Sequence, residues 1–207
     1  MMQKIIFATG NAGKMREIRD ILKGVDAQIL SMKEAGIDAD ITEDGTTFEE
    51  NAVIKAKAVA GILQGHEEEM CRNAVVLADD SGLEIDCLNK EPGIYSARYL
   101  GEDTPYSVKN KNLIGRLAGV PDEERTARFV CAIAAVLPDG EVITTRGVIE
   151  GRIGYQEKGD NGFGYDPIFY VPEYGCTTAQ LSEEEKNRIS HRGKALEAMK
   201  KELKKRI

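Results

Sequence analysis

Apolar and polar positions near the start of the chain follow first a strand pattern and then a helix pattern. Residues 4–8 form a short apolar run that predicts a strand, and the apolar positions of residues 15–22 then recur at helical spacing up to Gly24. A second helix is predicted to begin at the capping box formed by Thr47 and Glu50 and to end near residue 64. The first turn therefore joins a strand to a helix.

The rest of the chain continues this alternation. We predict, in order, a buried strand over 74–78, a turn at 79–82, a strand over 83–88, a helix over 108–117, a hairpin of residues 128–137 and 141–151, a helical turn opened by residues 182–185, and a final helix from Ser190. This order predicts an α/β fold with a mixed sheet. Because no repeat, low-complexity tract or linker divides the chain, residues 1–207 are expected to form a single domain.

Composition narrows the function classes. The 207 residues are 42% hydrophobic and 30% charged, which is typical of a folded globular protein. A net charge of -7 argues against a nucleic-acid backbone as the main partner, and no apolar run approaches the length of a membrane span. The cysteines are far apart in the sequence and form no Cys-x-x-Cys pair: Cys71, Cys87, Cys131 and Cys176. They predict reduced thiols in a cytoplasmic protein.

The turn Gly10-Asn11-Ala12-Gly13-Lys14 is a candidate phosphate site. It is not a P-loop, because Ala8 replaces the first glycine of that motif and Met15 replaces its Ser or Thr. Glycines nevertheless let the backbone approach a ligand, the following helix presents free N–H groups, and Lys14 adds a cation. A tight turn with a solvated lysine explains this stretch equally well.

Paired carboxylates supply the second candidate feature. Asp79 and Asp80 follow the apolar run 74–78, at the sheet edge where α/β folds usually bind ligands. Neighbouring carboxylates repel each other, so such a pair suits a divalent cation or a general base, although an ordinary Asp-Ser-Gly turn is the alternative. Glu43 and Asp44 precede the helix that carries Lys55. Together these features favour a metal-dependent enzyme that acts on a polyphosphate.

Several long segments resemble one enzyme family. They are TGNAGK, EDGTTFEENAVIKA, LADDSGLEID, PGIYSARY, GDNGFGYDPIF and LSEEEKNRISHRGKAL, and they extend from Thr9 to Leu196. In this order they resemble the inosine triphosphate pyrophosphatases, which hydrolyse non-standard purine nucleoside triphosphates. The resemblance implies an elongated, two-lobed α/β fold with a long mixed sheet, flanking helices and a central cleft, and it also implies a homodimer and a requirement for Mg²⁺.

The same resemblance assigns roles around the triphosphate. Residues Thr9, Gly10, Asn11, Ala12, Gly13 and Lys14 would hold the phosphates with help from Lys55. Asp80 would be the general base and a metal ligand, with Asp79 beside it and Ser81 on the substrate. Glu43 matches the further acidic metal ligand, although this chain reads Thr42-Glu43-Asp44 where some relatives have two glutamates. The metal role of Glu43 is therefore less firmly supported than that of Asp80.

A base pocket is expected from the last third of the chain. The resemblance places Phe163, Gly164, Tyr165, Asp166, Lys186, His191 and Arg192 there. A Gly-rich loop with core aromatic residues and a structural histidine would explain the same residues. However, His191 and Arg192 lie in the first turn of the last predicted helix, where the helix dipole disfavours extra cations, so these residues indicate an electron-rich ligand nearby. The other histidine, His66, lies in an acidic stretch and is expected at the surface.

The expected reaction is Mg²⁺-dependent hydrolysis of ITP, dITP or XTP to the nucleoside monophosphate and pyrophosphate, which clears these nucleotides from the pool. Two alternatives stay open. A related pyrophosphatase could act on other modified nucleotides, and a non-catalytic sensor could bind a nucleotide without turnover. The retained Asp79-Asp80 pair weighs against the sensor.

Overall fold

The structure is a computed structural model that describes residues 3–65 and 73–206; His66 and Cys71 lie outside these ranges. Its strands are β1 (Gln3–Phe7), β2 (Ala27–Ser31), β3 (Val75–Ile85), β4 (Thr126–Val136), β5 (Val142–Ile153), β6 (Phe169–Val171) and β7 (Cys176–Thr177). Its α-helices are α1 (Ala12–Ile21), α2 (Phe48–Gln64), α4 (Tyr106–Arg116), α5 (Glu183–Ile189) and α6 (His191–Leu203). Short 3₁₀ turns connect several of them, including Asp122–Glu124 and Asp166–Ile168.

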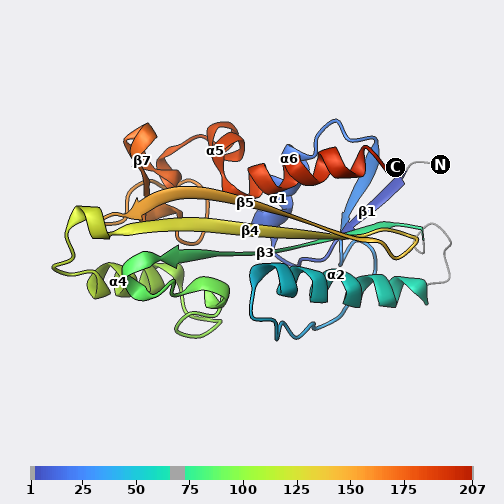
Figure 1. The fold of residues 1–207 in the computed structure, drawn as a ribbon, viewed down its shortest axis with the longest axis horizontal. Coiled ribbons are helices and arrows are strands. Elements are labelled where there is room, and N and C mark those ends of the chain that lie inside the picture. Colours follow the sequence, from blue (N-terminus) through green and yellow to red (C-terminus); the bar gives the residue numbers. More distant parts are fainter. Residues whose placement is uncertain (1–2, 66–72, 207) are drawn as a thin grey trace. The chain divides into compact units, whose positions relative to one another are not determined.

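The strands form one sheet in the order β2-β1-β3-β4-β5-β6-β7 (Figure 1). β1 pairs in parallel with both β2 and β3, whereas β6 pairs antiparallel with both β5 and β7. β4 and β5 are neighbours joined by a tight turn, in which the Leu137 N–H donates to the Glu141 carbonyl at 2.9 Å. The predicted α/β class, mixed sheet and hairpin are therefore confirmed.

The predicted turn at 79–82 is wrong, because β3 runs without interruption from Val75 to Ile85. Two adjacent carboxylates are unusual inside a buried strand. Here Lys14 of α1 pairs with Asp79, and the Asn51 amide of α2 donates to Asp80, so both buried acidic groups have a polar partner. The carboxylates thus lie in the middle of a rigid strand and not on a loop.

The start of α2 differs in one detail from the predicted capping box. The Thr47 hydroxyl accepts from the Glu50 N–H at 3.1 Å, as expected. The Glu50 carboxylate, however, accepts from the N–H and the hydroxyl of Thr46, both at 2.7 Å, and not from Thr47. The helix ends at Gln64 with Gly65 as its C-cap, where the sequence predicted.

The chain divides into two compact units that alternate along the sequence. Unit 1 contains residues 1–80, 131–147 and 194–207. Its core joins apolar residues of α1 and α6 to those of β1, β3 and the β4–β5 hairpin, and Figure 1 shows α2 on the opposite side of these strands. The buried residues of α2 are Phe48, Asn51, Ala52, Ala56, Val59 and Leu63. Unit 1 is therefore a sheet covered by helices on both faces.

Unit 2 contains residues 81–130 and 148–193. Its core includes Leu83 and Ile85 of β3, Leu113 of α4, and a tilted ring pair of Phe129 and Phe169 whose centroids lie 4.4 Å apart. The loop 159–166 rests on this core through Tyr165. That loop carries most of the residues predicted for the base pocket.

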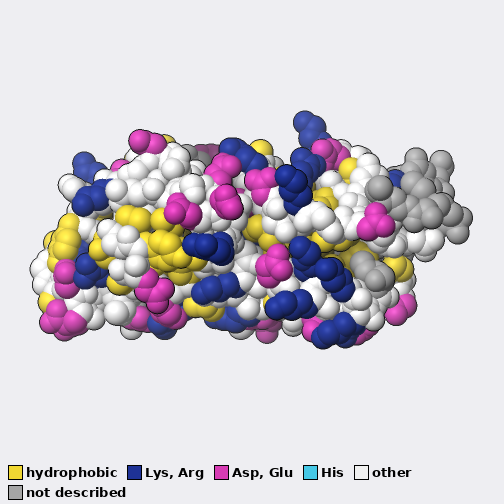
Figure 2. Space-filling view, turned by 90° about the horizontal axis from the view of Figure 1, so that it is seen from above, with side chains coloured by type: hydrophobic (Ala, Val, Ile, Leu, Met, Phe, Trp, Pro, Cys, Tyr) yellow, Lys and Arg dark blue, Asp and Glu magenta, His cyan; other side chains and the backbone are white. Residues whose placement is uncertain are grey.

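On the face drawn in Figure 2, Lys and Arg side chains lie among Asp and Glu side chains. Within residues 3–65 and 73–206, no helix combines the length and the apolar character that crossing a membrane requires. The three described cysteines, Cys87, Cys131 and Cys176, are free thiols.

Candidate active site

The predicted phosphate turn joins β1 to α1 in unit 1. Asn11 is the N-cap of α1: its side chain accepts from the Lys14 N–H at 3.0 Å, while its own N–H donates to the Thr9 hydroxyl at 3.2 Å. Ala12 and Gly13 form the first turn of the helix. A Cβ added at Gly10 would meet no protein atom within 4 Å, so packing does not require glycine there. This leaves the exposed turn open to a ligand that approaches the backbone.

Lys14 reaches from this turn to β3. Its ammonium lies 3.2 Å from Oδ1 and 3.1 Å from Oδ2 of Asp79, whose side chain is fully buried. A buried carboxylate needs such a partner, because burial without one costs several kcal/mol, on the order of 3 to 5 when a partner is removed. Asp79 therefore fixes Lys14 beside the helix N-terminus, and both of its oxygens face that cation.

Lys55 of α2 connects the acidic segment before the helix to the same strand. Its ammonium lies 2.9 Å from a carboxylate oxygen of Glu43 and donates to the Asp79 carbonyl at 3.0 Å. The structure thus brings two carboxylates and two ammonium groups into one cluster: Glu43, Asp79, Lys14 and Lys55. The sequence analysis assigned all four residues to the triphosphate site.

Asp80 adds a buried carboxyl with a raised pKa to this cluster. Only 8% of it is exposed, and burial raises its pKa to about 6 against the opposing pull of Lys55 and the Asn51 amide. The Asn51 Nδ2 donates to Asp80 Oδ2 at 3.1 Å, while the Asn51 Oδ1 accepts from the Gly45 N–H at 2.9 Å. An added Cβ at Gly45 would lie 2.6 Å from that amide oxygen, so glycine is required there.

Asn51 is a site residue that the sequence analysis missed. It lies one helical turn before Lys55, so both side chains leave the same face of α2. The signal was present in the spacing Asn-x-x-x-Lys beside the acidic segment. Buried Asn side chains usually orient a neighbouring polar group, and here the group is Asp80.

The carboxylates suit a Mg²⁺ ion that completes its coordination with substrate oxygens. Within the described ranges, no three His, Cys, Asp or Glu side chains are grouped closely enough to enclose a metal. Mg²⁺ commonly binds through one or two carboxylates together with phosphate oxygens and water. Glu43 raises the pKa of Asp80 by its charge, so the two carboxylates repel each other. Asp79 is the weaker candidate ligand, since Lys14 occupies both of its oxygens.

In unit 2, Asp166 organises the loop that was predicted to hold the base. Its Oδ2 accepts from the Phe163 N–H at 2.8 Å and from the Lys186 ammonium at 2.7 Å, and its Oδ1 accepts from the Thr178 hydroxyl at 2.8 Å. Gly162 has φ +76°, and an added Cβ there would lie 2.3 Å from the same carboxylate. Asp166 therefore holds the loop in its conformation through these hydrogen bonds and fixes the ammonium of Lys186.

Replacing Asp166 with Asn is expected to lower the free energy of unfolding by about 2 kcal/mol, because Lys186 loses its buried ionic partner and one charged acceptor is removed. Urea denaturation measures this change. Asp160→Asn removes an exposed carboxylate of the same loop and is the matched control, with an expected change below about 0.5 kcal/mol. Equal effects of the two substitutions would contradict the organising role of Asp166.

Two cationic side chains of unit 2 lie near the ring of Phe163. The Lys186 ammonium lies 4.9 Å, and the Arg192 guanidinium carbon 5.5 Å, from the centroid of its ring. Arg192 is 2% exposed and donates through Nη2 to the Ser81 hydroxyl at 3.1 Å. Four of the predicted residues, Ser81, Phe163, Lys186 and Arg192, are thus brought together.

The other predicted base-pocket residues have strong packing roles. His191 begins α6, one residue after the predicted start at Ser190, and stacks on Phe129 with ring centroids 4.8 Å apart. Tyr165 is buried in the core, donates to the Ser96 carbonyl at 2.6 Å, and has its pKa raised by burial. The Gly164 carbonyl accepts from the Asn110 amide at 3.3 Å, a loop contact from α4 that the sequence analysis also missed.

Comparison with known proteins identifies relatives over nearly the full chain. A model of the Ham1 family matches residues 5–202. A dITP/XTP pyrophosphatase of Clostridium perfringens is 50% identical over 98% of each chain, and one of Exiguobacterium sibiricum is 46% identical over 95% of this chain and 94% of its own. Among solved structures, the Staphylococcus aureus Ham1 protein has a TM-score of 0.85 and 41% identity, covering 99% of this chain and 100% of its own.

Proposed function

Because this chain belongs to the Ham1 family, we infer that it is an enzyme that hydrolyses non-standard purine nucleoside triphosphates, such as dITP and XTP, to the monophosphate and pyrophosphate. The observation that carries the chemistry is the buried Asp80 carboxyl, which Asn51 holds within a cluster containing Lys14, Lys55 and Glu43. A carboxyl with a pKa of about 6 is mostly ionised at neutral pH and still basic enough to accept a proton. Its place among lysines suits a triphosphate substrate.

The reaction is direct attack by water at the α phosphorus. Asp80 accepts one proton of the water while the water oxygen forms a bond to the α phosphorus. The bond from this phosphorus to the bridging oxygen of the α–β anhydride breaks, and that oxygen leaves with pyrophosphate. Lys14, at the N-terminus of α1, and Lys55 offset the negative charge of the phosphates. The Asn51 amide keeps the Asp80 carboxylate in one orientation during this transfer.

We propose that Asp80 and Glu43 hold Mg²⁺ together with the substrate phosphates. A bound Mg²⁺ would neutralise charge on the phosphate oxygens and on the departing pyrophosphate. The assignment is supported by Lys55, whose ammonium contacts both Glu43 and the backbone carbonyl of Asp79, and by the repulsion between the two carboxylates, which a shared cation would relieve. Asp79 mainly fixes Lys14 in this scheme.

In unit 2, we propose that Arg192 and Lys186 recognise the 6-oxo group of the purine. Both cations lie over Phe163, whose ring offers a stacking surface, and both are buried hydrogen-bond donors, which an oxo group complements as an acceptor. Ser81 accepts from Arg192 and fixes its direction. Tyr165 and His191 support this arrangement through their packing.

A substrate panel tests the function. The enzyme should release pyrophosphate from dITP, ITP and XTP with Mg²⁺ at least about 10²-fold more efficiently than from ATP or GTP, since each mismatched polar contact costs roughly 1 to 3 kcal/mol. In heavy-oxygen water, the label should appear in the monophosphate. Preferred turnover of modified pyrimidine triphosphates would support the related pyrophosphatase instead, and label in pyrophosphate would exclude attack at the α phosphorus. A non-catalytic sensor would show no release at all.

The pH profile tests the two roles of Asp80. Protonation of this carboxyl removes both the base and a metal ligand, so kcat/KM should fall as the pH drops through about 6. Metal and proton compete for the same oxygens, and the midpoint of the acid limb should therefore move to lower pH as the Mg²⁺ concentration rises. Steady-state rates at constant ionic strength measure both effects. A midpoint that stays fixed across Mg²⁺ concentrations contradicts metal binding at Asp80.

We also propose that the chain forms a homodimer in the cytoplasm. Three large apolar side chains between residues 95 and 108 of unit 2 each expose about half of their surface: Tyr95, Leu100 and Val108. Exposed apolar side chains that form a patch are typical of protein interfaces, and free thiols suit a reducing compartment. Light scattering coupled to size exclusion should give twice the mass of the chain, and Leu100→Lys should reduce that mass. A monomer for the unaltered chain would contradict the proposal.

A further inference from the structure

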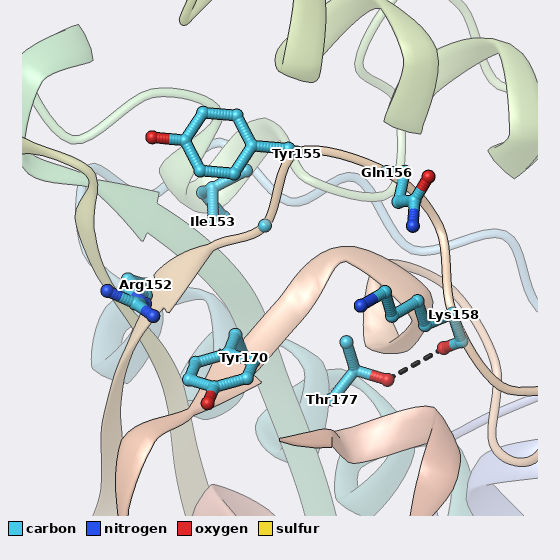
Figure 3. Close-up of a pocket in the computed structure, with 8 residues that line it drawn as sticks. Arg152, Ile153, Tyr155, Gln156, Lys158, Tyr170 and Thr177 are labelled. Atoms are coloured by element: carbon cyan, nitrogen blue, oxygen red, sulfur yellow. Dashed lines mark hydrogen bonds between the residues drawn. The ribbon is translucent and has the colours of Figure 1, made fainter. Parts of the chain in front are cut away.

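A pocket lies in unit 2, and none of its residues belongs to the proposed reaction. Its volume is about 310 Å³, near the lower limit for small-molecule sites. It is lined by Arg152, Ile153, Gly154, Tyr155, Gln156, Lys158, Tyr170 and Thr177 (Figure 3). Aromatic rings and cationic groups therefore share one small concave surface.

A network of buried and ionic contacts fixes one wall of the pocket. Asp122 accepts from the Tyr155 hydroxyl and from Arg152 Nη1, the latter at 3.0 Å. Arg125, which is buried, lies with its guanidinium carbon 4.2 Å from the centroid of the Tyr155 ring and donates to the Ile153 and Gly154 carbonyls, both at 2.8 Å. The exposed Tyr155 ring is thus held in place before any ligand arrives.

Tyr170 forms a second aromatic wall. The Arg152 guanidinium carbon lies 4.6 Å from the centroid of its ring. Asp122 balances the charge of Arg152, so this arginine acts chiefly as a rigid connection between the two tyrosines. Figure 3 shows both rings on the same side of the pocket as Arg152.

Lys158 supplies a cation whose backbone is fixed. Its N–H donates to the Pro167 carbonyl at 2.9 Å, and its carbonyl accepts from the Thr177 hydroxyl at 2.7 Å. Figure 3 shows its side chain extending toward the space between Tyr155 and Tyr170. In the part of the chain that the structure describes, its ammonium forms no ion pair. The pocket therefore carries a net positive charge opposite two aromatic rings.

We propose that this pocket binds a small aromatic anion, with its ring against Tyr155 or Tyr170 and its carboxylate or phosphate on Lys158. Two aromatic walls favour a planar ring, and the ammonium favours the anionic group. An aromatic carboxylate and a pyrimidine nucleoside monophosphate are the two ligand sources that share this chemistry. The Gln156 amide offers a further hydrogen-bonding group at the rim.

Titration of the full chain with indole-3-carboxylate, uridine monophosphate and inorganic phosphate tests the proposal. Calorimetry should detect saturable binding of one or both aromatic anions, and Lys158→Met should weaken it at least about fivefold. Lys111→Met removes an exposed lysine of α4 and is the matched control, with unchanged affinity expected. Tyr155→Ala should weaken binding of the aromatic anions but leave that of phosphate unchanged.

The comparison among ligands decides the outcome. Binding of the carboxylate alone or of the nucleotide alone identifies the source and supports the site. Three results would overturn it: no saturable binding of either aromatic anion, affinity unaffected by Lys158→Met, or inorganic phosphate binding as tightly as the aromatic anions. Thermal unfolding of each variant establishes that the fold is retained, and both lysine variants should hydrolyse dITP at the unaltered rate.

Discussion

Asp80→Asn is expected to lower turnover of dITP by at least about 10²-fold, the low end of the contribution of a positioned base. The substitution keeps the shape of the side chain, and its amide oxygen can still accept from Asn51. It removes the proton acceptor and one negative charge that a cation could use. Steady-state kinetics with saturating Mg²⁺ measure the loss.

The same substitution should make the protein more stable. Burial raises the pKa of Asp80 from an ordinary 3.8 to about 6, so the folded state binds the proton more tightly than the unfolded state. The contribution of this group to the free energy of unfolding therefore falls as the pH rises from about 4 to about 6, and the deficit persists at neutral pH. Asn carries no charge to bury, and at pH 7.5 without Mg²⁺ it should stabilise the fold by about 1 to 3 kcal/mol.

Opposite changes in activity and stability distinguish a functional carboxylate from a structural one. Asp44→Asn removes an exposed carboxylate next to Glu43 and is the matched control, with small effects on both quantities. If Asp80→Asn retains most of its activity at saturating Mg²⁺, the assignment of Asp80 as base and metal ligand is wrong. If it loses both activity and stability, its role is structural.

The position of Asp80 shows where sequence reasoning reached its limit. Adjacent Asp residues followed by Ser-Gly favour a turn by local propensity, and a turn was predicted. The strand continues because Lys14 and Asn51 come from elements far away in the sequence to pair with the two carboxylates. Local propensity contains no information about such partners, so the sequence analysis placed the two carboxylates in a turn and not in the strand that carries them.

The sequence analysis also missed three strands, namely β2, β6 and β7. β6 has three residues and β7 has two, and β6 is held by pairing with β5 while β7 pairs with β6. Runs this short carry no readable periodicity. By contrast, α2 and the β4–β5 hairpin were located well, because a cap, a glycine or a tight turn bounds a long apolar pattern in each.

The largest effect expected in unit 2 is on substrate choice. Arg192→Met should reduce kcat/KM for dITP on the order of 10²-fold while changing kcat/KM for ATP much less. The ratio of kcat/KM for dITP to that for ATP should therefore fall. The O6 atom of hypoxanthine accepts hydrogen bonds, whereas the amino group of adenine donates them and would face the donors of Arg192. Methionine keeps most of the buried volume of the side chain, so the packing is retained. It has no hydrogen-bond donor, so the discrimination between hypoxanthine and adenine is lost.

The control for Arg192→Met is Arg188→Gln, which removes a cation from the exposed face of α5 and should leave both substrates unaffected. Thermal unfolding of the methionine variant checks that the loss of the bond to Ser81 has not unfolded the unit. An equal loss of kcat/KM for dITP and ATP would mean that Arg192 serves the phosphates or the fold. In that case Lys186, fixed by Asp166 over the same Phe163 ring, becomes the residue that reads the base, and Lys186→Met should narrow the ratio in its place.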